Sequence, residues 1–184
     1  MSASPSVSLR PLGADDVIAV QAVYEATPGY FEMMTGAPAP AYEASREFDN
    51  LAANVRLSSR RSPGRLWLGL FVPDAAGLPD LIGLLDLRLD FPEPQTVTLG
   101  LLLVIEARQR QGLGSQAYRL IEGWLRQQGF RVVELHVAGH AFGAQQFWRR
   151  LGFEFTGQQQ RVALGPKSVR LLALSKSLAP PAEG

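Results

Sequence analysis

Cysteine is absent from the 184-residue sequence. Its absence excludes disulfide bonds, thiolate metal ligands and a cysteine nucleophile. Histidine is nearly as scarce: there are two, not grouped with other ligand types, so we expect no metal cofactor. Long apolar runs are also missing, because the stretch Leu99 to Ile105 is far shorter than the ~20 residues that cross a membrane. We therefore expect no membrane partner.

An excess of one charge sign is missing too. The sequence has 18 basic and 17 acidic residues, a net charge of +1, so we expect no nucleic-acid partner. The basic cluster Arg60, Arg61 and Arg65 is interpreted as a solvated loop. The first residues lack the basic start and apolar core of a signal peptide, which predicts a cytoplasmic location. Monomer and homodimer both stay open.

Length and composition predict one domain over residues 1–184, with residues 1–6 and 179–184 as disordered tails. Hydrophobic residues make up 46% and charged residues 19% of the chain, as in ordinary globular proteins. Such a chain is long enough to bury a core of its own.

The order of the expected elements predicts a mixed α/β (α+β) fold. A strand at 7–12 and a helix from Gly13 that stops before Pro28 come first, and a second helix covers 45–55. Strands at 66–72, 81–90 and 96–105 form an antiparallel meander joined by short turns. The strand at 132–137 follows a helix and should run parallel to 96–105. A hairpin of 154–161 and 169–177 completes a mostly antiparallel sheet of six or seven strands, flanked by about four helices.

An expected anion-binding loop follows the strand at 96–105. Six polar or small residues lead to Gly112 and Gly114, where an amphipathic helix begins that Gly129 can end. The first N–H groups of a helix lack partners, and its dipole favours negative charge there. Glycine lets a phosphate approach the backbone. The segment therefore predicts a phosphate or pyrophosphate ligand.

One interpretation of these glycines is a dinucleotide fingerprint. Gly112, Gly114 and Ala117 match GxGxxA, and Glu134 follows in the next strand. Residues 106–111, however, separate the first glycine from the strand, which fits that fingerprint poorly. A dinucleotide-dependent oxidoreductase stays open as an alternative.

A second interpretation rests on two motifs in order. The segment 109–114, QRQGLG, resembles the Q/R-x-x-G-x-G/A motif of the GNAT superfamily of N-acetyltransferases. Downstream, 141–153 resembles the second family motif, N-x-x-A-x-x-h-Y-x-x-x-G-F. The chain is accordingly identified as resembling a small bacterial member over residues 96 to about 157. The resemblance implies the GNAT fold and direct transfer of an acetyl group from acetyl-CoA to an amine of a small molecule or protein.

The resemblance also implies which residues bind acetyl-CoA. The phosphates would lie on the loop and first helical turn: Gln109, Arg110, Gln111, Gly112, Leu113, Gly114 and Ser115. The backbone of Leu102, Leu103 and Val104 would pair with the pantetheine amides as an added strand. Phe147 and Trp148 of the second motif complete the expected cofactor site.

The acceptor amine must lose a proton before it reacts, so a base is expected. Asp86 lies in an apolar strand and needs a partner or a function; Arg88, on the same face, is the expected partner. His140 follows a strand at its carboxyl end, where α/β ligands gather. Asp86 and His140 are thus the candidate catalytic residues. His136, by contrast, is interpreted as structural.

An aromatic segment after the first helix is expected to cover the acceptor. Tyr30 and Phe31 lie there, and GNAT enzymes roof the substrate pocket with this segment. Together with Asp86 they are the expected substrate-binding residues.

Two positions depart from the second family motif. Trp148 stands where tyrosine is usual, and an indole cannot protonate the leaving thiolate. Ala141 stands where asparagine is usual. A non-enzymatic acyl-CoA-binding protein therefore stays open as an alternative.

Overall fold

Five α-helices and a seven-stranded sheet make up residues 6–57 and 64–179, the part of the chain that the computed structural model describes. The strands are β1 (Ser8–Pro11), β2 (Arg65–Pro73), β3 (Pro79–Leu89), β4 (Thr96–Val104), β5 (Val132–Ala138), β6 (Glu154–Leu164) and β7 (Lys167–Ser177). The helices are α1 (Val17–Glu25), α2 (Pro28–Thr35), α3 (Glu43–Leu57), α4 (Leu113–Gln127) and α5 (Phe142–Arg150).

The sheet has the mixed topology that the sequence predicts. Its strand order is β1-β2-β3-β4-β5-β7-β6, and all neighbours are antiparallel except β4 and β5. The predicted parallel pair is confirmed, with Thr96 opposite Val132 and Leu99 opposite Leu135. A right-handed crossover through α4 is the connection expected for such a pair.

The parallel pair is short, and the two strands separate immediately after it. No residue of β4 beyond Leu99 and none of β5 beyond Leu135 has a partner in the other strand. At the same place the register between β3 and β4 shifts, with Asp86 opposite Leu101 and Leu87 opposite Leu99. Gly100 therefore belongs to neither ladder. We call this divergence of β4 and β5 the fork.

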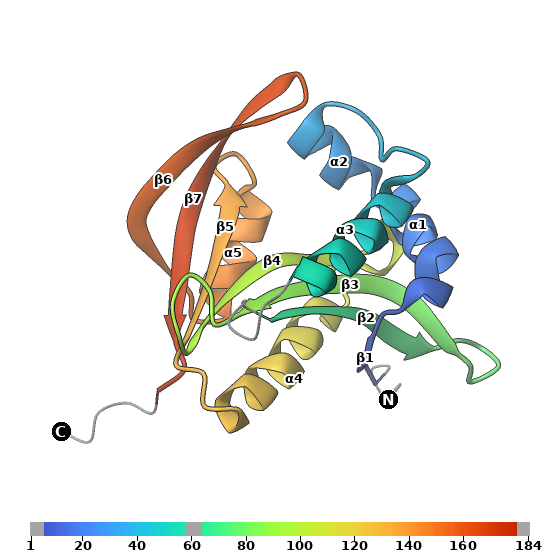
Figure 1. Cartoon of the computed structure of the whole chain (residues 1–184), viewed down its shortest axis with the longest axis horizontal. Coiled ribbons are helices and arrows are strands. Elements are labelled where there is room, and N and C mark those ends of the chain that lie inside the picture. The colour runs from blue at the N-terminus through green and yellow to red at the C-terminus, as the bar shows by residue number, and fades with distance from the viewer. Residues whose placement is uncertain (1–5, 58–63, 180–184) are drawn as a thin grey trace.

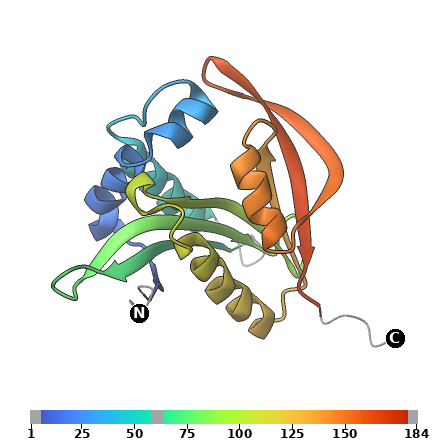
Figure 2. The ribbon, with the colours of Figure 1, turned by 180° about the vertical axis from the view of Figure 1, so that it is seen from behind.

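Helices cover both faces of the sheet (Figures 1 and 2). On one face α1, α2 and α3 pack on β2, β3 and β4, with Val20, Phe31 and Trp67 in the core. On the other face α4 and α5 pack around Tyr118 and Phe153. The two cores hold β4 from both sides, which agrees with its unbroken apolar sequence.

The proline- and glycine-rich segment after α1 contains a short helix. Pro28 begins α2, where its missing N–H costs no hydrogen bond. Gly36 ends α2 with φ of 81°, a left-handed conformation that glycine adopts without strain. The second long helix begins at Glu43, slightly before the predicted start at Ser45.

Contacts from two distant segments hold α2 in place. The backbone N–H of Gly29 donates to Glu106 Oε1 at 2.8 Å, in the turn that follows β4. Lys167 Nζ donates to the carbonyl oxygen of Glu32 at 2.6 Å, from the start of β7. Figure 1 shows the tip of the β6–β7 hairpin reaching across to α2. The helix thus bridges the two halves of the sheet.

Some predicted features fall outside the described residues. They include most of both expected tails, residues 1–5 and 180–184, and the Arg60 and Arg61 positions of the basic cluster. In the part that is described, no helix combines the length and apolar character that a membrane span requires.

Gly83 provides a test of how closely β3 and β4 approach. A Cβ atom at Gly83 would overlap the carbonyl oxygen of Leu103, a backbone atom that cannot move aside alone. We expect Gly83→Ala to lower the free energy of unfolding by about 3 kcal/mol, as overpacking does. Gly13→Ala is the control, because no atom lies within 4 Å of the position that its methyl group would take. Urea denaturation measures both; equal stabilities would contradict this packing.

Candidate functional site

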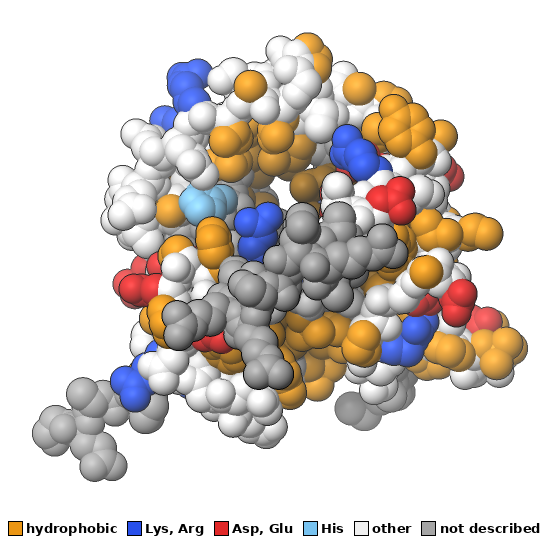
Figure 3. Space-filling model, viewed as in Figure 1, with side chains coloured by type: hydrophobic (Ala, Val, Ile, Leu, Met, Phe, Trp, Pro, Cys, Tyr) orange, Lys and Arg blue, Asp and Glu red, His pale blue; other side chains and the backbone are white. Residues whose placement is uncertain are grey.

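A cavity of about 260 Å³ lies at the fork. We call it the fork cavity. On the α5 side it is lined by Ala141, Ala144 and Trp148. On the α2 side it is lined by Tyr30, Met33 and Met34, with Leu171 of β7 beside them. Figure 3, which views the face covered by α1, α2 and α3, shows a central hollow bordered by apolar side chains. The cavity thus connects the two faces of the sheet.

The edge of β4 that faces the cavity has no strand beside it. Beyond Leu99, the alternate N–H and C=O groups that point away from β3 have no β5 partner. Leu102 lines the cavity, while the Leu103 side chain is buried in the core. The carbonyl of Val104, at the end of this edge, already accepts a hydrogen bond from Gln109 Nε2 at 2.9 Å. The backbone groups of the edge before it have no strand partner and favour an extended, amide-containing ligand.

The N-terminus of α4 lies next to the end of this edge. Gly112 is its N-cap residue, with φ of 79°, and no side chain caps the helix. A Cβ atom at Gly114 would lie 3.5 Å from Phe147 Cζ and 3.9 Å from Val104 Cγ2. The first turn of α4 therefore touches both α5 and the end of β4. Free N–H groups and the helix dipole make this turn suitable for a phosphate.

The loop before α4 has a conformation that favours glycine. Arg110 adopts a φ of 60°, in the left-handed region. The GNAT motif often has glycine at this position, which the positive φ explains. Arg110 keeps an exposed side chain, and Gln111 Nε2 donates to the Ala107 carbonyl at 3.2 Å, which stabilises the turn. A guanidinium group is thus available close to the α4 N-terminus.

Trp148 forms one wall of the fork cavity within an aromatic cluster. Its ring centroid lies 4.8 Å from that of Phe147, 5.2 Å from Phe153 and 5.6 Å from Tyr118. The side chain is buried. Its position indicates a packing role at the α5 side of the cavity.

Tyr30 and Phe31, the expected roof residues, have different surroundings. Tyr30 lines the cavity, while Phe31 is buried and makes edge-to-face contacts with Tyr30 and Tyr24, each at 5.3 Å. Burial, together with the nearby carboxylates of Glu43 and Glu47, raises the pKa of Tyr30. Its hydroxyl therefore stays protonated at neutral pH and can donate a hydrogen bond.

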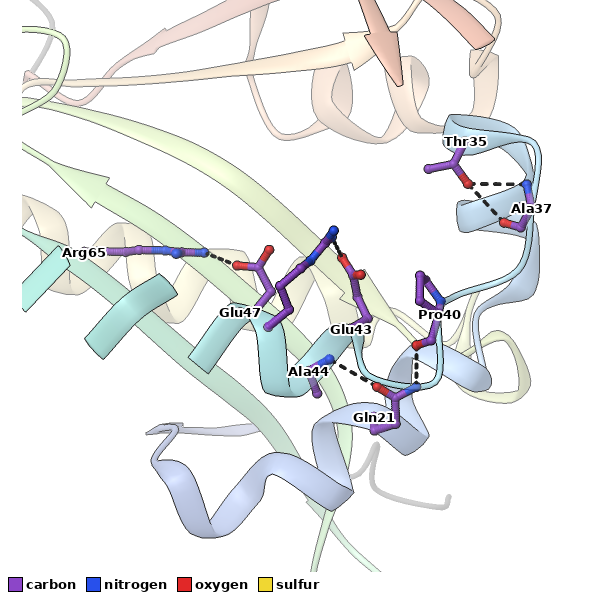
Figure 4. Close-up of polar contacts among 9 residues, drawn as sticks. Gln21, Thr35, Ala37, Pro40, Glu43, Ala44, Glu47 and Arg65 are labelled. Carbon is purple, nitrogen blue, oxygen red and sulfur yellow. Dashed lines mark hydrogen bonds and ion pairs between the residues drawn. The ribbon is translucent and has the colours of Figure 1, made fainter. Parts of the chain in front are cut away.

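Asp86 lies on the same face of the sheet as Tyr30. The predicted pairing of Asp86 with Arg88 is wrong. Arg65, and not Arg88, binds Asp86: Nε contacts Oδ1 at 2.8 Å and Nη2 contacts Oδ2 at 3.2 Å. Arg65 Nη2 also contacts Glu47 Oε2 at 3.1 Å, as Figure 4 shows. The register between β2 and β3 explains this pairing. Arg65 lies opposite Arg88 and Trp67 lies opposite Asp86, so Arg65 and Asp86 are diagonal neighbours on the same face of the sheet.

This pairing corrects the interpretation of Arg65 as part of a solvated loop. Arg65 begins β2 and is held by two carboxylates. Asp86 in turn lies behind the cavity wall, with Oδ2 3.0 Å from the position of a Cβ atom at Gly100. A carboxylate occupied in this way by a guanidinium is poorly suited to accept a proton.

The two histidines differ in their relation to the cavity. Val133, Leu135 and Val137 of β5 face the α4–α5 core, so His136 points to the α2 side, where it lines the cavity. It directly follows the last residue of β5 that pairs with β4. His140 lies in the exposed turn after β5 and is absent from the lining. Sequence alternation could have indicated His136, since it lies opposite the buried face.

A second, more open hollow of about 350 Å³ lies beside α4. Its polar lining includes Glu122, which contacts Lys176 at 2.6 Å and Arg126 at 2.8 Å. Burial alone would favour neutral Glu122, but the hydrogen bonds from these two cations lower its pKa. Lys176 and Arg126 thus act as counter-ions of the Glu122 carboxylate. The hollow does not touch the free edge of β4, so the fork cavity is the better candidate.

Comparison with protein families identifies the class. The model of the acetyltransferase (GNAT) family matches residues 22–153. The chain belongs to this family, and family membership supports acyl-CoA-dependent acetyl transfer as the general activity. Comparison with curated proteins gives no match.

Solved structures share the fold. An acetyltransferase from Thermus thermophilus has a TM-score of 0.73 and 25% identity, covering 96% of this chain and 99% of that one. The PaiA N-acetyltransferase from Thermoplasma acidophilum, in complex with coenzyme A, has a TM-score of 0.65 and 14% identity, covering 94% and 99%. Spermidine N-acetyltransferase from Vibrio cholerae, in complex with CoA and spermine, has a TM-score of 0.70 and 12% identity, covering 94% and 96%.

The Arg65–Asp86 pair can be tested by stability. Asp86→Asn removes one carboxylate from a half-buried guanidinium, so we expect the free energy of unfolding to fall by about 1–2 kcal/mol. Arg88→Gln is the matched control, because Arg88 is exposed and Asp86 pairs elsewhere; we expect a change within about 0.5 kcal/mol. If Arg88→Gln proved the more damaging in denaturant titrations, the pairing would be wrong.

Proposed function

We propose that the protein is an N-acetyltransferase that moves an acetyl group directly from acetyl-CoA to an amine. The observation that carries the proposal is the fork cavity. The unpaired edge of β4 and Trp148 of α5 line it on one side, and Tyr30 and His136 line it on the other; the uncapped N-terminus of α4 lies outside this lining, beside the Val104 end of the same edge. A cofactor can enter from the first side while the acceptor approaches from the second.

In this proposal the cofactor follows the free edge of β4. The pyrophosphate lies on the N–H groups of the first turn of α4, with Arg110 supplying a charged contact. The pantetheine amides pair with the backbone from Val104 back to Gly100. Phe147 and Trp148 form the wall beside this path. The thioester then lies at Gly100, which lines the cavity and has no ladder partner in either neighbouring strand.

His136 is the proposed proton acceptor. An amine with a pKa of about 10.4 is neutral in roughly one molecule per thousand at pH 7, so proton removal is a large part of the task. Among the described residues that line the cavity, His136 and Tyr30 carry the ionisable groups, and the phenol of Tyr30 stays protonated. His136 is also on the acceptor side. Asp86 and His140 stay predictions with less support, since neither lines the cavity.

The reaction balances without a protein acid. His136 first takes the ammonium proton and passes it to solvent. The neutral amine nitrogen then attacks the thioester carbonyl carbon, the second proton that this nitrogen must lose passes to His136, and the C–S bond breaks to release the CoA thiolate. A thiol of pKa about 8.5 leaves as a stable anion that water can protonate. Trp148, which cannot donate such a proton to the thiolate, is therefore compatible with turnover.

Trp148 also favours one alternative, a protein that binds acyl-CoA without transferring the acyl group. Thiol release from acetyl-CoA in the presence of amines distinguishes the two. The dinucleotide-dependent oxidoreductase has no support from the family match.

Gly114 offers a test of the cofactor site that leaves the fold intact. The motif accepts alanine at this position, so valine is the variant that tests it; the nearest atom to its Cβ would be Phe147 Cζ at 3.5 Å, an ordinary contact. The branched side chain would stand beside the N–H groups that a phosphate approaches. We expect Gly114→Val to raise the Kd for acetyl-CoA about tenfold, or ~1.4 kcal/mol.

Gly123→Val is the matched control for this test. It makes the same change in the same helix, with nothing within 4 Å of the added Cβ atom, so we expect an unchanged Kd. Calorimetric titration with acetyl-CoA measures both variants. Equal affinities for the two would remove the α4 N-terminus from the proposed site.

His136 can be tested through the pH dependence of turnover. We expect His136→Asn to lower kcat about 100-fold at pH 7 without changing the Kd for acetyl-CoA. The difference in kcat between His136→Asn and the unmodified protein should shrink toward pH 10, because the acceptor amine then loses its proton to solvent. His140→Asn tests the sequence-based candidate in parallel. A deficit for His136→Asn that is constant with pH would indicate a structural role instead.

A further inference from the structure

The acceptor side of the fork cavity is covered by α2. Tyr30, Met33 and Met34 of α2 face β4 across the cavity, and Leu171 of β7 lies at its side. Two hydrogen bonds hold this helix in place, from the Gly29 N–H to Glu106 at 2.8 Å and from Lys167 to the Glu32 carbonyl at 2.6 Å. The stem of Lys167 packs on Gly36, with Cδ 3.4 Å from the position that a Cβ atom would take there.

The enclosed space is small. Its volume of about 260 Å³ lies below the ~300 Å³ at which typical ligand pockets begin, and the acetyl end of the cofactor shares it. The part of the acceptor that enters this space must therefore be small.

The lining on this side is apolar and carries no carboxylate among the described residues. Three carboxylates lie nearby but outside the lining. Asp86 and Glu47 bind Arg65, and Glu43 binds Arg46 through one oxygen while its buried Oε2 has no partner. A second ammonium group on the acceptor would lose its hydration without gaining a counter-ion, which is costly. Thioether side chains such as Met33 and Met34 instead adapt to apolar groups of varied shape.

We propose that the acceptor is a small primary amine with an apolar body and no second charge, such as an alkylamine or arylalkylamine. The apolar body packs against Met33, Met34 and Leu171, and the amino group faces His136 and the thioester. This inference rests on the proposed function and narrows its substrate class. Polyamines, with a second charge, and peptide amino groups, with a polar body, are expected to be poor acceptors.

A matched pair of amines tests the inference. Hexylamine and 1,5-diaminopentane have the same number of heavy atoms, but the diamine ends in an ammonium group where hexylamine has a methyl group. We expect kcat/KM for hexylamine to exceed that for the diamine at least tenfold. A tetrapeptide with a free N-terminal alanine should react at least a hundredfold more slowly than hexylamine.

Met34→Glu tests the lining directly. The half-buried position tolerates a carboxylate, which should shift the ratio of hexylamine to diamine turnover toward the diamine by at least tenfold. Ile18→Glu is the control, because Ile18 is 82% exposed on α1 and absent from the lining. For Ile18→Glu, the ratio of hexylamine to diamine turnover should equal that of the unmodified protein.

The outcomes separate the inference from the proposed function. Equal turnover of the diamine or the peptide overturns the inference and leaves the acetyltransferase proposal intact. If no amine is acetylated, the proposed function fails. Calorimetric binding of the same two amines to the CoA-bound protein then still decides the inference: tighter hexylamine binding supports it, and equal or tighter diamine binding overturns it.

Discussion

The early end of the pairing between β4 and β5 is the constraint on which the site depends. Strands in a sheet normally satisfy each other's backbone groups, and unpaired groups away from water are costly. Here the ladder stops at Leu99 and Leu135, and a register shift leaves Gly100 outside both neighbouring ladders. The edge of β4 beyond Leu99 is therefore available to a ligand.

The helix α2 covers one side of this opening. Two hydrogen bonds, from Gly29 to Glu106 and from Lys167 to Glu32, connect α2 to the turn after β4 and to β7. The same helix presents Tyr30, Met33 and Met34 to the cavity. In the proposed function, these side chains contact the acceptor and restrict which amines can bind.

The fold and the acceptor chemistry are separate properties in this family. The chain shares its architecture with a spermidine N-acetyltransferase at 12% identity, which shows the fold alone. Family membership accounts for the shared loop and helix that suit a CoA phosphate. The acceptor depends on side chains from α2, β5 and β7, whose character in this chain is mainly apolar. We therefore infer the cofactor from the family and the acceptor from the lining.

The sequence by itself determined the elements whose interactions are local. The loop and helix around Gly112, the parallel pair and the closing hairpin depend on neighbouring residues or on the order of strands, and all are present as predicted. Only the tertiary structure decided that Arg65 binds Asp86, that His136 lines the cavity while His140 does not, and that Met33 and Met34 roof it. Those contacts join segments far apart in the chain. They depend on strand register and on which faces the helices cover, and neither quantity is encoded in any short stretch of sequence.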